Sequence, residues 1–165
     1  MVKVIKVERT AKDILEEIKT HANQTNREGM SRFGINTENA FGVSVTRLKE
    51  IAKGIKKSHK VALELWNMGY HEARIMAILL EEPDKLEERQ LDSWVKDFNS
   101  WDICDLTCMY LISKSEFCEK KINEWHTRSK EFEKRAAFAI IAAAAVHQKN
   151  GMTKNLLICY LLLNR

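Results

Sequence analysis

Apolar residues recur along most of this chain at spacings of three and four, which is the period of helices that bury one face. The pattern predicts helices over residues 11–19, 28–33, 45–57, 59–66, 70–81, 88–98, 101–113, 115–128 and 131–148. No segment alternates apolar and polar residues over the length of a strand. The sequence therefore predicts an all-α fold without a sheet.

Capping residues mark the ends of several of these helices. Thr10, Ser44 and Ser58 each precede an apolar-periodic segment, where a hydroxyl can accept hydrogen bonds from the amides of the first turn. Gly34 and Gly69 follow helical segments and predict left-handed helix ends. Periodicity and capping chemistry thus agree on where these helices begin and end.

Three predicted helices, 70–81, 101–113 and 131–148, are more apolar than their neighbours and follow one another about every 30 residues. Amphipathic helices alternate with them at about 35 to 40 residues per pair, the period of HEAT-like solenoids. We therefore predict a right-handed solenoid of HEAT-like antiparallel helix pairs, an α-α superhelix, in a single domain over residues 1–165. Because no strict sequence repeat is visible, an irregular helical bundle is the alternative.

The composition agrees with a helical globular protein. A single proline and 6 glycines among 165 residues are too few for the turns of a compact β-protein. Apolar residues make up 45% and charged residues 30%, which excludes a wholly disordered chain. The N-terminus is too polar for a secretory signal and no disulfide framework is visible. A cytoplasmic location is expected, with reduced thiols at Cys104, Cys108, Cys118 and Cys159.

The last segment, residues 151–165, is an atypical tail that is apolar on nearly all sides. Its run LLICYLLL falls far short of the roughly 20 apolar residues of a membrane-spanning helix, so a soluble protein without membrane contact is expected. A closing repeat normally carries a polar outer face. The tail is therefore expected either to be buried by packing, with self-association through it as one route, or to mark a chain that stops before its cap.

Charge is unevenly distributed along the chain, whose net charge is +4. Residues 44–60 hold six basic side chains and one acid, a local +5, whereas residues 81–105 hold nine acids and three basic side chains, a local −6. On charge alone, ordinary solvated helix faces are the simpler explanation. A surface that faces a polyanion is the alternative.

The most informative residues are Trp101 and Asp105, which are four apart and share a face of the predicted helix 101–113. Asp105 lies between apolar neighbours on an expected inner helix, where a carboxylate needs a partner or a purpose. Arg135, near the start of the next inner helix, is its candidate partner. A structural Asp–Arg pair and a functional site are both open from these residues alone.

Other polar residues lie at the starts of inner helices. Ser100 is a candidate N-cap, and Asp102 occupies a first turn, where the helix dipole favours an anion. His71, Glu72 and Arg74 at the start of helix 70–81 are expected to be structural polar contacts.

Two alternatives to this site are weaker. Cys104 and Cys108 share a helix face, but neither a histidine nor a CxxC motif accompanies them, so buried thiols are expected and no metal site. Three tryptophans fall at helical spacing in apolar faces and are expected to be core residues: Trp66, Trp94 and Trp125.

The motif Trp-Asp-Ile-Cys-Asp at 101–105, followed thirty residues later by Lys-Arg-Ala-Ala-Phe at 134–138, resembles the bacterial and archaeal DNA alkylation repair glycosylases built of HEAT-like repeats. The pairing at this spacing is fairly specific. Individually weaker matches extend the resemblance over residues 10–148, at 32–38, 41–45 and 71–77. Members of that family usually continue for about another third of their length, so a C-terminally shortened homologue, active or inactive, is expected.

The resemblance implies excision of positively charged N-alkylated purines, such as 7-methylguanine and 3-methyladenine, from double-stranded DNA. It places Trp101 and Asp105 at the lesion and Arg135 in support of the site and the DNA backbone. The alkylated purine is already cationic and leaves without an enzyme acid, so a carboxylate that stabilises the cationic sugar suits the chemistry. An aromatic face can hold a cation, and an arginine keeps the carboxylate ionised.

No metal or organic cofactor is required for this reaction. Basic residues are the candidates for phosphate contacts along the DNA: Lys134, Arg32, Lys49, Lys53 and Lys57. The rival hypothesis is a non-catalytic helical-repeat module that binds DNA or a protein partner. Salt-sensitive binding without base release would favour this rival.

Overall fold

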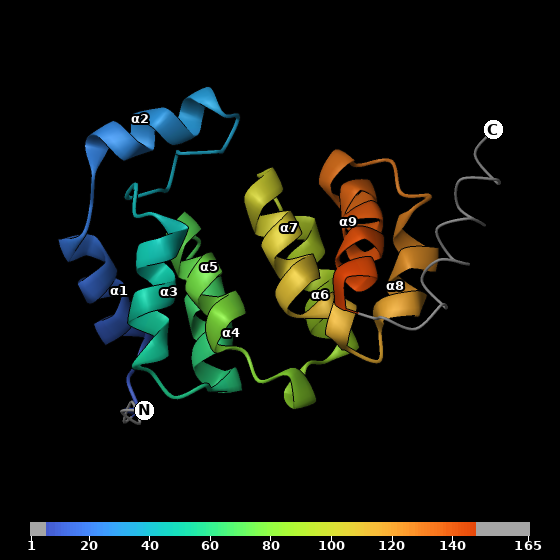
Figure 1. The fold of residues 1–165 in the computed structure, drawn as a ribbon, viewed down its shortest axis with the longest axis horizontal. Helices are drawn as coiled ribbons and strands as arrows, with labels where there is room; N and C mark the ends of the chain where they lie inside the picture. The colour runs from blue at the N-terminus through green and yellow to red at the C-terminus, as the bar shows by residue number, and fades with distance from the viewer. Residues whose placement is uncertain (1–5, 148–165) are drawn as a thin grey trace. The chain divides into compact units, whose positions relative to one another are not determined.

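The computed structural model describes residues 6–147, which fold into helices joined by short segments (Figure 1). No strand forms among these residues, where Val7 and Ile55 make an isolated parallel bridge. The all-α class predicted from the pattern is confirmed. The α-helices are α1 (Ala11–Thr20), α2 (Gln24–Arg32), α3 (Val45–Lys53), α4 (His59–Asn67), α5 (His71–Leu80), α6 (Glu88–Trp94), α7 (Trp101–Tyr110), α8 (Cys118–Trp125) and α9 (Glu131–His147).

The described residues form two compact units. Unit 1 comprises residues 6–86 and 99–103, and unit 2 comprises residues 87–98 and 104–147. Helix α7 therefore begins in unit 1 and continues in unit 2. The single domain expected over residues 1–165 stays a prediction.

In unit 1, α5 packs against α1, α3 and α4, as the grouping of these helices in Figure 1 also shows. Nearly all of its residues are buried, because apolar side chains occur on every side of this helix. This agrees with the inner position predicted for residues 70–81. The capping residues Thr10, Ser44 and Ser58 each accept a hydrogen bond from a first-turn amide, as their sequence positions predicted.

Helix α2 buries no residue, and Figure 1 shows it set apart from α1 and α3. It is held by the loop that precedes α3. Glu72, a fully buried residue of α5, accepts hydrogen bonds of 2.7–3.0 Å from the amides of Phe41, Gly42 and Val43. Gly42 adopts φ +81°, and a Cβ there would lie 2.2 Å from the Asn23 carbonyl oxygen. The buried Glu72 carboxylate and the glycine required at position 42 thus fix the loop that holds α2.

The helix predicted over residues 45–57 ends early, at Lys53, so the candidate phosphate contacts Lys49, Lys53 and Lys57 do not all lie on one helix. Gly54 caps α3 after Lys53, and the next residues pair with the N-terminal segment. The amide of Val7 donates to the Gly54 carbonyl at 3.0 Å, and the amide of Lys56 donates to the Val7 carbonyl at 2.9 Å. These tertiary hydrogen bonds replace helical ones, so Lys57 does not continue the face of α3.

Other boundaries differ for similar local reasons. Helix α2 begins four residues before the predicted start because the Asn23 side chain caps it by accepting from the Asn26 amide. The helices predicted over 88–98 and 101–113 end sooner, and each is followed by a short 3-10 turn, at Val95–Asp97 and Ile112–Lys114. The helix predicted over 115–128 is shorter at both ends.

In unit 2, α9 packs against α8 and against the two 3-10 turns. The predicted core tryptophans are confirmed, since Trp94 and Trp125 of this unit and Trp66 of unit 1 are all buried. The atypical tail at 151–165 lies outside the described residues. Within the described part, no helix has the length and apolar character to span a membrane.

A buried lysine joins α6 to α8. The Lys121 ammonium is fully buried and donates to Glu88, Asp92 and Glu124 at 2.7–2.9 Å. Burial alone would lower the pKa of Lys121, but these three hydrogen bonds outweigh it and raise the pKa. The carboxylates lie close enough together to hold a metal ion, but the ammonium already lies between them and contacts all three.

Lys121→Met is expected to destabilise the protein by about 3 kcal/mol, because three carboxylates lose the cation between them. Urea unfolding at neutral pH measures the loss. Lys120→Met is the matched control: Lys120 also pairs with Glu88 but is more than half exposed, so its loss should cost at most about 1 kcal/mol. Equal effects of the two substitutions would contradict a special role for the buried ammonium.

Candidate functional site

Asp105 and Arg135 form a bidentate ion pair within unit 2. The Arg135 Nε donates to Asp105 Oδ1 at 2.9 Å, and Nη2 donates to Oδ2 at 2.7 Å. The pairing inferred from the sequence is thus present in the structure. Asp105 is less buried than its apolar neighbours suggested: the side chains are 37% and 44% exposed. The carboxylate therefore has a partner and is still reachable from solvent.

Two cysteines fix the helices that carry this pair. The Cys104 thiol donates to the Phe132 carbonyl at 3.7 Å, and the Cys108 thiol donates to the Ala136 carbonyl at 3.5 Å. Both cysteines are buried, as predicted, and burial raises the pKa of Cys108 well above its usual value. The two thiols thus donate to α9 on both sides of the Asp105–Arg135 pair and hold α7 in register with α9.

Trp101 begins α7 and belongs to unit 1. The residue is 38% exposed, and its indole Nε1 donates to the backbone carbonyl of Phe33 at 3.0 Å. Phe33 follows directly after α2, and its own side chain is largely exposed. The tryptophan proposed from the motif is therefore partly exposed and anchored through its nitrogen.

Asp102, next to Trp101, is buried and densely hydrogen-bonded within unit 1. It lies 2.9 Å from His71 Nε2 and accepts from the Ser100 hydroxyl at 2.7 Å and from the Ile103 amide at 2.9 Å. Burial would raise the pKa of Asp102, but the hydrogen bonds from His71, Ser100 and Ile103 outweigh it and lower the pKa. The Ser100 hydroxyl, a candidate cap in the sequence, here donates to a carboxylate.

Asp102→Asn is expected to be less stable than the wild type at neutral pH, and the difference should narrow as the pH falls below 3.8, the ordinary pKa of this carboxyl. A lowered pKa in the folded state adds stability above the ordinary pKa, and this is lost as the pH falls through the folded value. Urea unfolding from about pH 5 to about pH 2.5 measures both proteins. A constant difference across this range would contradict the expectation.

The candidate phosphate contacts are distributed over several elements. Arg32 is exposed at the end of α2, Lys53 at the end of α3, and Lys134 in the first turn of α9. Lys49 is half-buried in α3. Lys57 lies beyond that helix and donates to the Glu81 carbonyl at 3.0 Å, so its ammonium is engaged within the protein.

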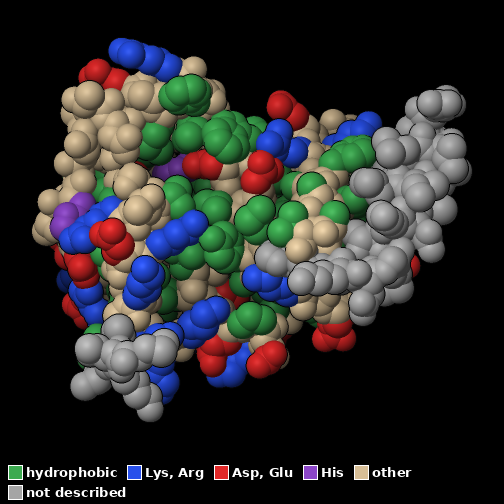
Figure 2. Space-filling view, in the orientation of Figure 1, with side chains coloured by type: hydrophobic (Ala, Val, Ile, Leu, Met, Phe, Trp, Pro, Cys, Tyr) green, Lys and Arg blue, Asp and Glu red, His purple; other side chains and the backbone are tan. Residues whose placement is uncertain are grey.

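Ion pairs temper the basic character expected for residues 44–60. Arg47 pairs with Glu50 at 2.8 Å, and Lys56 pairs with Glu8 at 2.7 Å. Figure 2 shows acidic side chains among the lysines and arginines around α3 in unit 1. Glu50 is already counted in the local charge of +5, so of these two pairs only Lys56–Glu8 brings in a carboxylate from outside residues 44–60.

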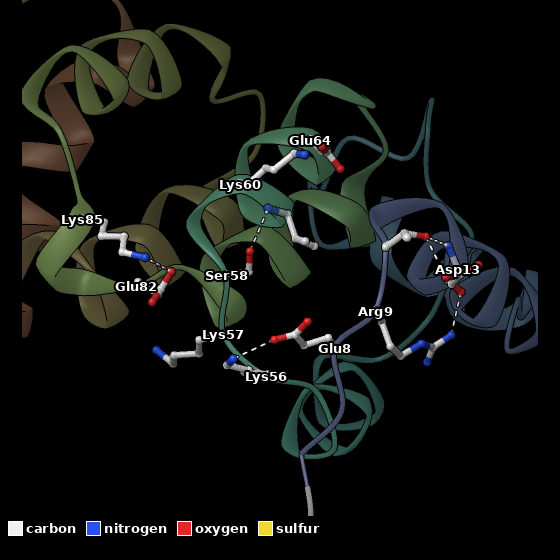
Figure 3. A pocket seen from close by; sticks show the side chains of 12 residues that line it. Glu8, Arg9, Asp13, Lys56, Lys57, Ser58, Lys60, Glu64, Glu82 and Lys85 are labelled. Atoms are coloured by element: carbon white, nitrogen blue, oxygen red, sulfur yellow. Dashed lines mark hydrogen bonds and ion pairs between the residues drawn. The ribbon is translucent and has the colours of Figure 1, made fainter.

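A surface pocket of about 570 Å³ lies in unit 1, between the start of α1 and the start of α4 (Figure 3). Lysines line it, but carboxylates do so as well: Lys56 pairs with Glu8 and Lys85 with Glu82 across its wall. Mixed charge of this kind gives no preference for an anionic or a cationic ligand. We therefore place the candidate site at α7 and not in this pocket.

Comparison with known proteins identifies the family. The family model described as DNA alkylation repair enzyme matches residues 14–164. The chain belongs to this family. The matched range also extends beyond residue 148, where the motif-based resemblance fades. No curated protein sequence matches the chain significantly.

A solved structure supports the fold of this family member. It belongs to "a new family of proteins related to the HEAT-like repeat DNA glycosylases with affinity for branched DNA structures" and aligns with a TM-score of 0.78 at 21% sequence identity. The alignment covers 86% of this chain and 60% of the other, so the chain spans about 60% of that protein's length. The HEAT-like helical fold predicted from the sequence is confirmed.

The sequence did not reveal the link between His71 and Asp102. Each was assigned a separate local role, His71 as a helix-start contact and Asp102 as a partner of the helix dipole. They are 31 residues apart, and the available signal was only that two buried helix starts each carry an ionisable residue. Proximity of α5 and the start of α7 in the fold was needed to pair them.

Proposed function

We propose that this family member is a DNA glycosylase that excises cationic N-alkylated purines, such as 7-methylguanine and 3-methyladenine, from double-stranded DNA. The observation that carries the proposal is the reachable, bidentately held carboxylate of Asp105, four residues from the exposed Trp101 on α7. Residues four apart project from one face of a helix. The motif thus supplies both a carboxylate and an aromatic ring, which suit a cationic ligand.

The reaction is hydrolysis of the N-glycosidic bond between purine N and sugar C1′. The bonding electrons go to the purine, whose positive charge is thereby cancelled, so the base leaves neutral without protonation. Positive charge builds on the sugar as the bond breaks, and the Asp105 carboxylate stabilises it electrostatically. The water oxygen then bonds C1′ and its proton passes to bulk water.

Each proposed site residue has a role that follows from the chemistry of its side chain. Each Asp105 oxygen accepts from Arg135 and has a second lone pair for the attacking water. Trp101 offers its ring face to the cationic sugar or base, worth about 0.5–2 kcal/mol. Arg135 and Lys134 hold phosphates, and Arg32, Lys49 and Lys53 extend the backbone contacts, whereas the engaged ammonium of Lys57 makes it the weakest of these candidates.

The test is release of 7-methylguanine from methylated duplex DNA by the 165-residue chain, followed by chromatography of the freed base. Release above the spontaneous rate supports the proposal. No release by a folded, helical protein that binds the DNA would overturn it.

The second candidate is binding without base release. It is favoured by the likeness to a solved protein whose family is described by its affinity for branched DNA. Titration of a four-way junction and a linear duplex of the same length, at two salt concentrations, separates the two functions. Tighter junction binding without base release would select this alternative.

A further inference from the structure

The pair of His71 and Asp102 is a buried polar contact that the proposed chemistry does not use. Both residues lie in unit 1, and they are 5% and 8% exposed. Because an ionised carboxylate only accepts, the His71 Nε2 carries a proton and donates to Asp102 Oδ2 at 2.9 Å. The start of α5 is thereby joined to the start of α7.

The other ring nitrogen of His71 makes this contact more informative. Within the described residues Nδ1 is buried and has no hydrogen-bond partner. A buried polar atom without a partner costs folding free energy, and an apolar side chain of similar size would avoid that cost. The hydrogen bond from Nε2 to Asp102 is therefore the polar contact that accounts for an imidazole at this position.

What Asp102 controls is the first turn of α7. Its Oδ1 accepts from the Ser100 hydroxyl and from the Ile103 amide, which are the residues on either side of the Trp101–Asp102 pair. Trp101 lies between these fixed points, and its indole nitrogen reaches the Phe33 carbonyl. Asp102 thus fixes the backbone on both sides of Trp101, and the Phe33 carbonyl fixes its Nε1. Together these contacts determine the plane of the indole ring.

We infer that His71 is a positioning residue for Trp101 and acts through Asp102. The expected effect of His71 on base release rests on the proposed function. The expected effect of His71 on the orientation of the Trp101 indole does not. His71 does not touch the lesion. It fixes the first turn of α7, so that the ring face of Trp101 is presented in one orientation to a cationic sugar or purine.

The test uses the fluorescence of Trp101 in the full chain. Trp66, Trp94 and Trp125 are buried, so acrylamide quenching above the level of a Trp101→Phe variant reports the exposed indole. In His71→Leu the Trp101 quenching constant should rise. In His71→Gln, whose amide can donate to Asp102, it should return towards the wild-type value.

The matched control is His59→Leu. His59 is another histidine of unit 1 paired to a buried carboxylate, with its Nδ1 2.9 Å from Glu81 Oε1. Its hydrogen bonds within residues 6–147 go to Glu81 and Glu82 and not to α7. It should lower the unfolding temperature and leave the Trp101 quenching constant unchanged. The same constant in His71→Leu and wild type would overturn the inference, as would an equal rise in His59→Leu.

Base release gives a second readout. Under single turnover with saturating enzyme, His71→Leu should release 7-methylguanine roughly 10-fold to 100-fold more slowly than wild type, because a misplaced group loses its alignment with the reacting bond. His71→Gln should recover most of the rate. Full activity of His71→Leu would contradict a positioning role.

Two further outcomes keep the inference separate from the proposed function. Wild-type protein without base release would defeat the glycosylase proposal, and the quenching comparison would still decide the role of His71. Should His71→Leu fail to fold, Asp102→Asn takes its place, since it weakens the same contact with little change in shape. A wild-type quenching constant in Asp102→Asn would then overturn the inference.

Discussion

Asp105→Asn should lower the rate of 7-methylguanine release by about 100-fold or more, because it removes the charge that stabilises the cationic sugar in the transition state. The fold should be retained, since the Asp105–Arg135 pair is partly exposed and such pairs contribute at most about 1 kcal/mol. Single-turnover release from methylated duplex measures the rate, and circular dichroism with urea unfolding measures the fold.

A control for this substitution is available in unit 1. Glu50→Gln breaks the ion pair with Arg47, which has a comparable 2.8 Å contact and comparable exposure but lies on α3. It should leave base release within about twofold of wild type, because surface pairs away from the reacting atoms affect little. An Asp105→Asn protein that releases the base as fast as wild type would exclude the electrostatic role assigned to this carboxylate.

Glu72→Gln should destabilise the protein by about 3 kcal/mol, the second large effect that the structure predicts. The fully buried carboxylate accepts from three consecutive amides at Oε1, and the Phe41 amide also donates to Oε2. A glutamine keeps one acceptor oxygen but loses the charge, and its NH2 group turns a donor towards the Phe41 amide. The unfolding temperature should fall by roughly 10 °C for a chain of this size. Differential scanning calorimetry measures the shift.

The prediction also says which part of the fold Glu72→Gln loosens. Glu72 holds the loop at 41–43, which in turn holds α2, so limited proteolysis of Glu72→Gln should cut first near residues 24–41. Glu64→Gln, on the exposed side of α4, is the control and should change stability by at most about 0.5 kcal/mol. Unfolding of Glu72→Gln at the wild-type temperature would show that the three hydrogen bonds contribute little.

The local signals in the sequence were accurate where short-range chemistry decides the outcome. The hydroxyls of Thr10, Ser44 and Ser58 cap helices as predicted, because a cap needs only the residues of the next turn. Gly34 and Gly69 adopt positive φ where helices end. Predictions failed where a distant segment competes, as when Val7 takes the hydrogen bonds that would have prolonged α3.

The candidate site divides in the same way. The motif placed Trp101 and Asp105 on one helix, and the regular inner-helix spacing identified Arg135 as the partner of Asp105, which the bidentate contact bears out. Their roles in catalysis remain proposals for experiment. The link between His71 and Asp102 was missed, because pairing two single residues across 31 positions requires knowing which helix starts meet.

The sequence by itself determined the helical class, most helix positions and the family, because periodicity, caps and a spaced motif are properties of short stretches and of their regular repetition. Only the tertiary structure decided which charges neutralise one another. Lys121 became the centre of three carboxylates, Lys56 of the basic segment at 44–60 was paired with the distant Glu8, and Asp105 stayed reachable. Electrostatic interactions depend on distance and burial in space, which the order of residues along a chain does not specify.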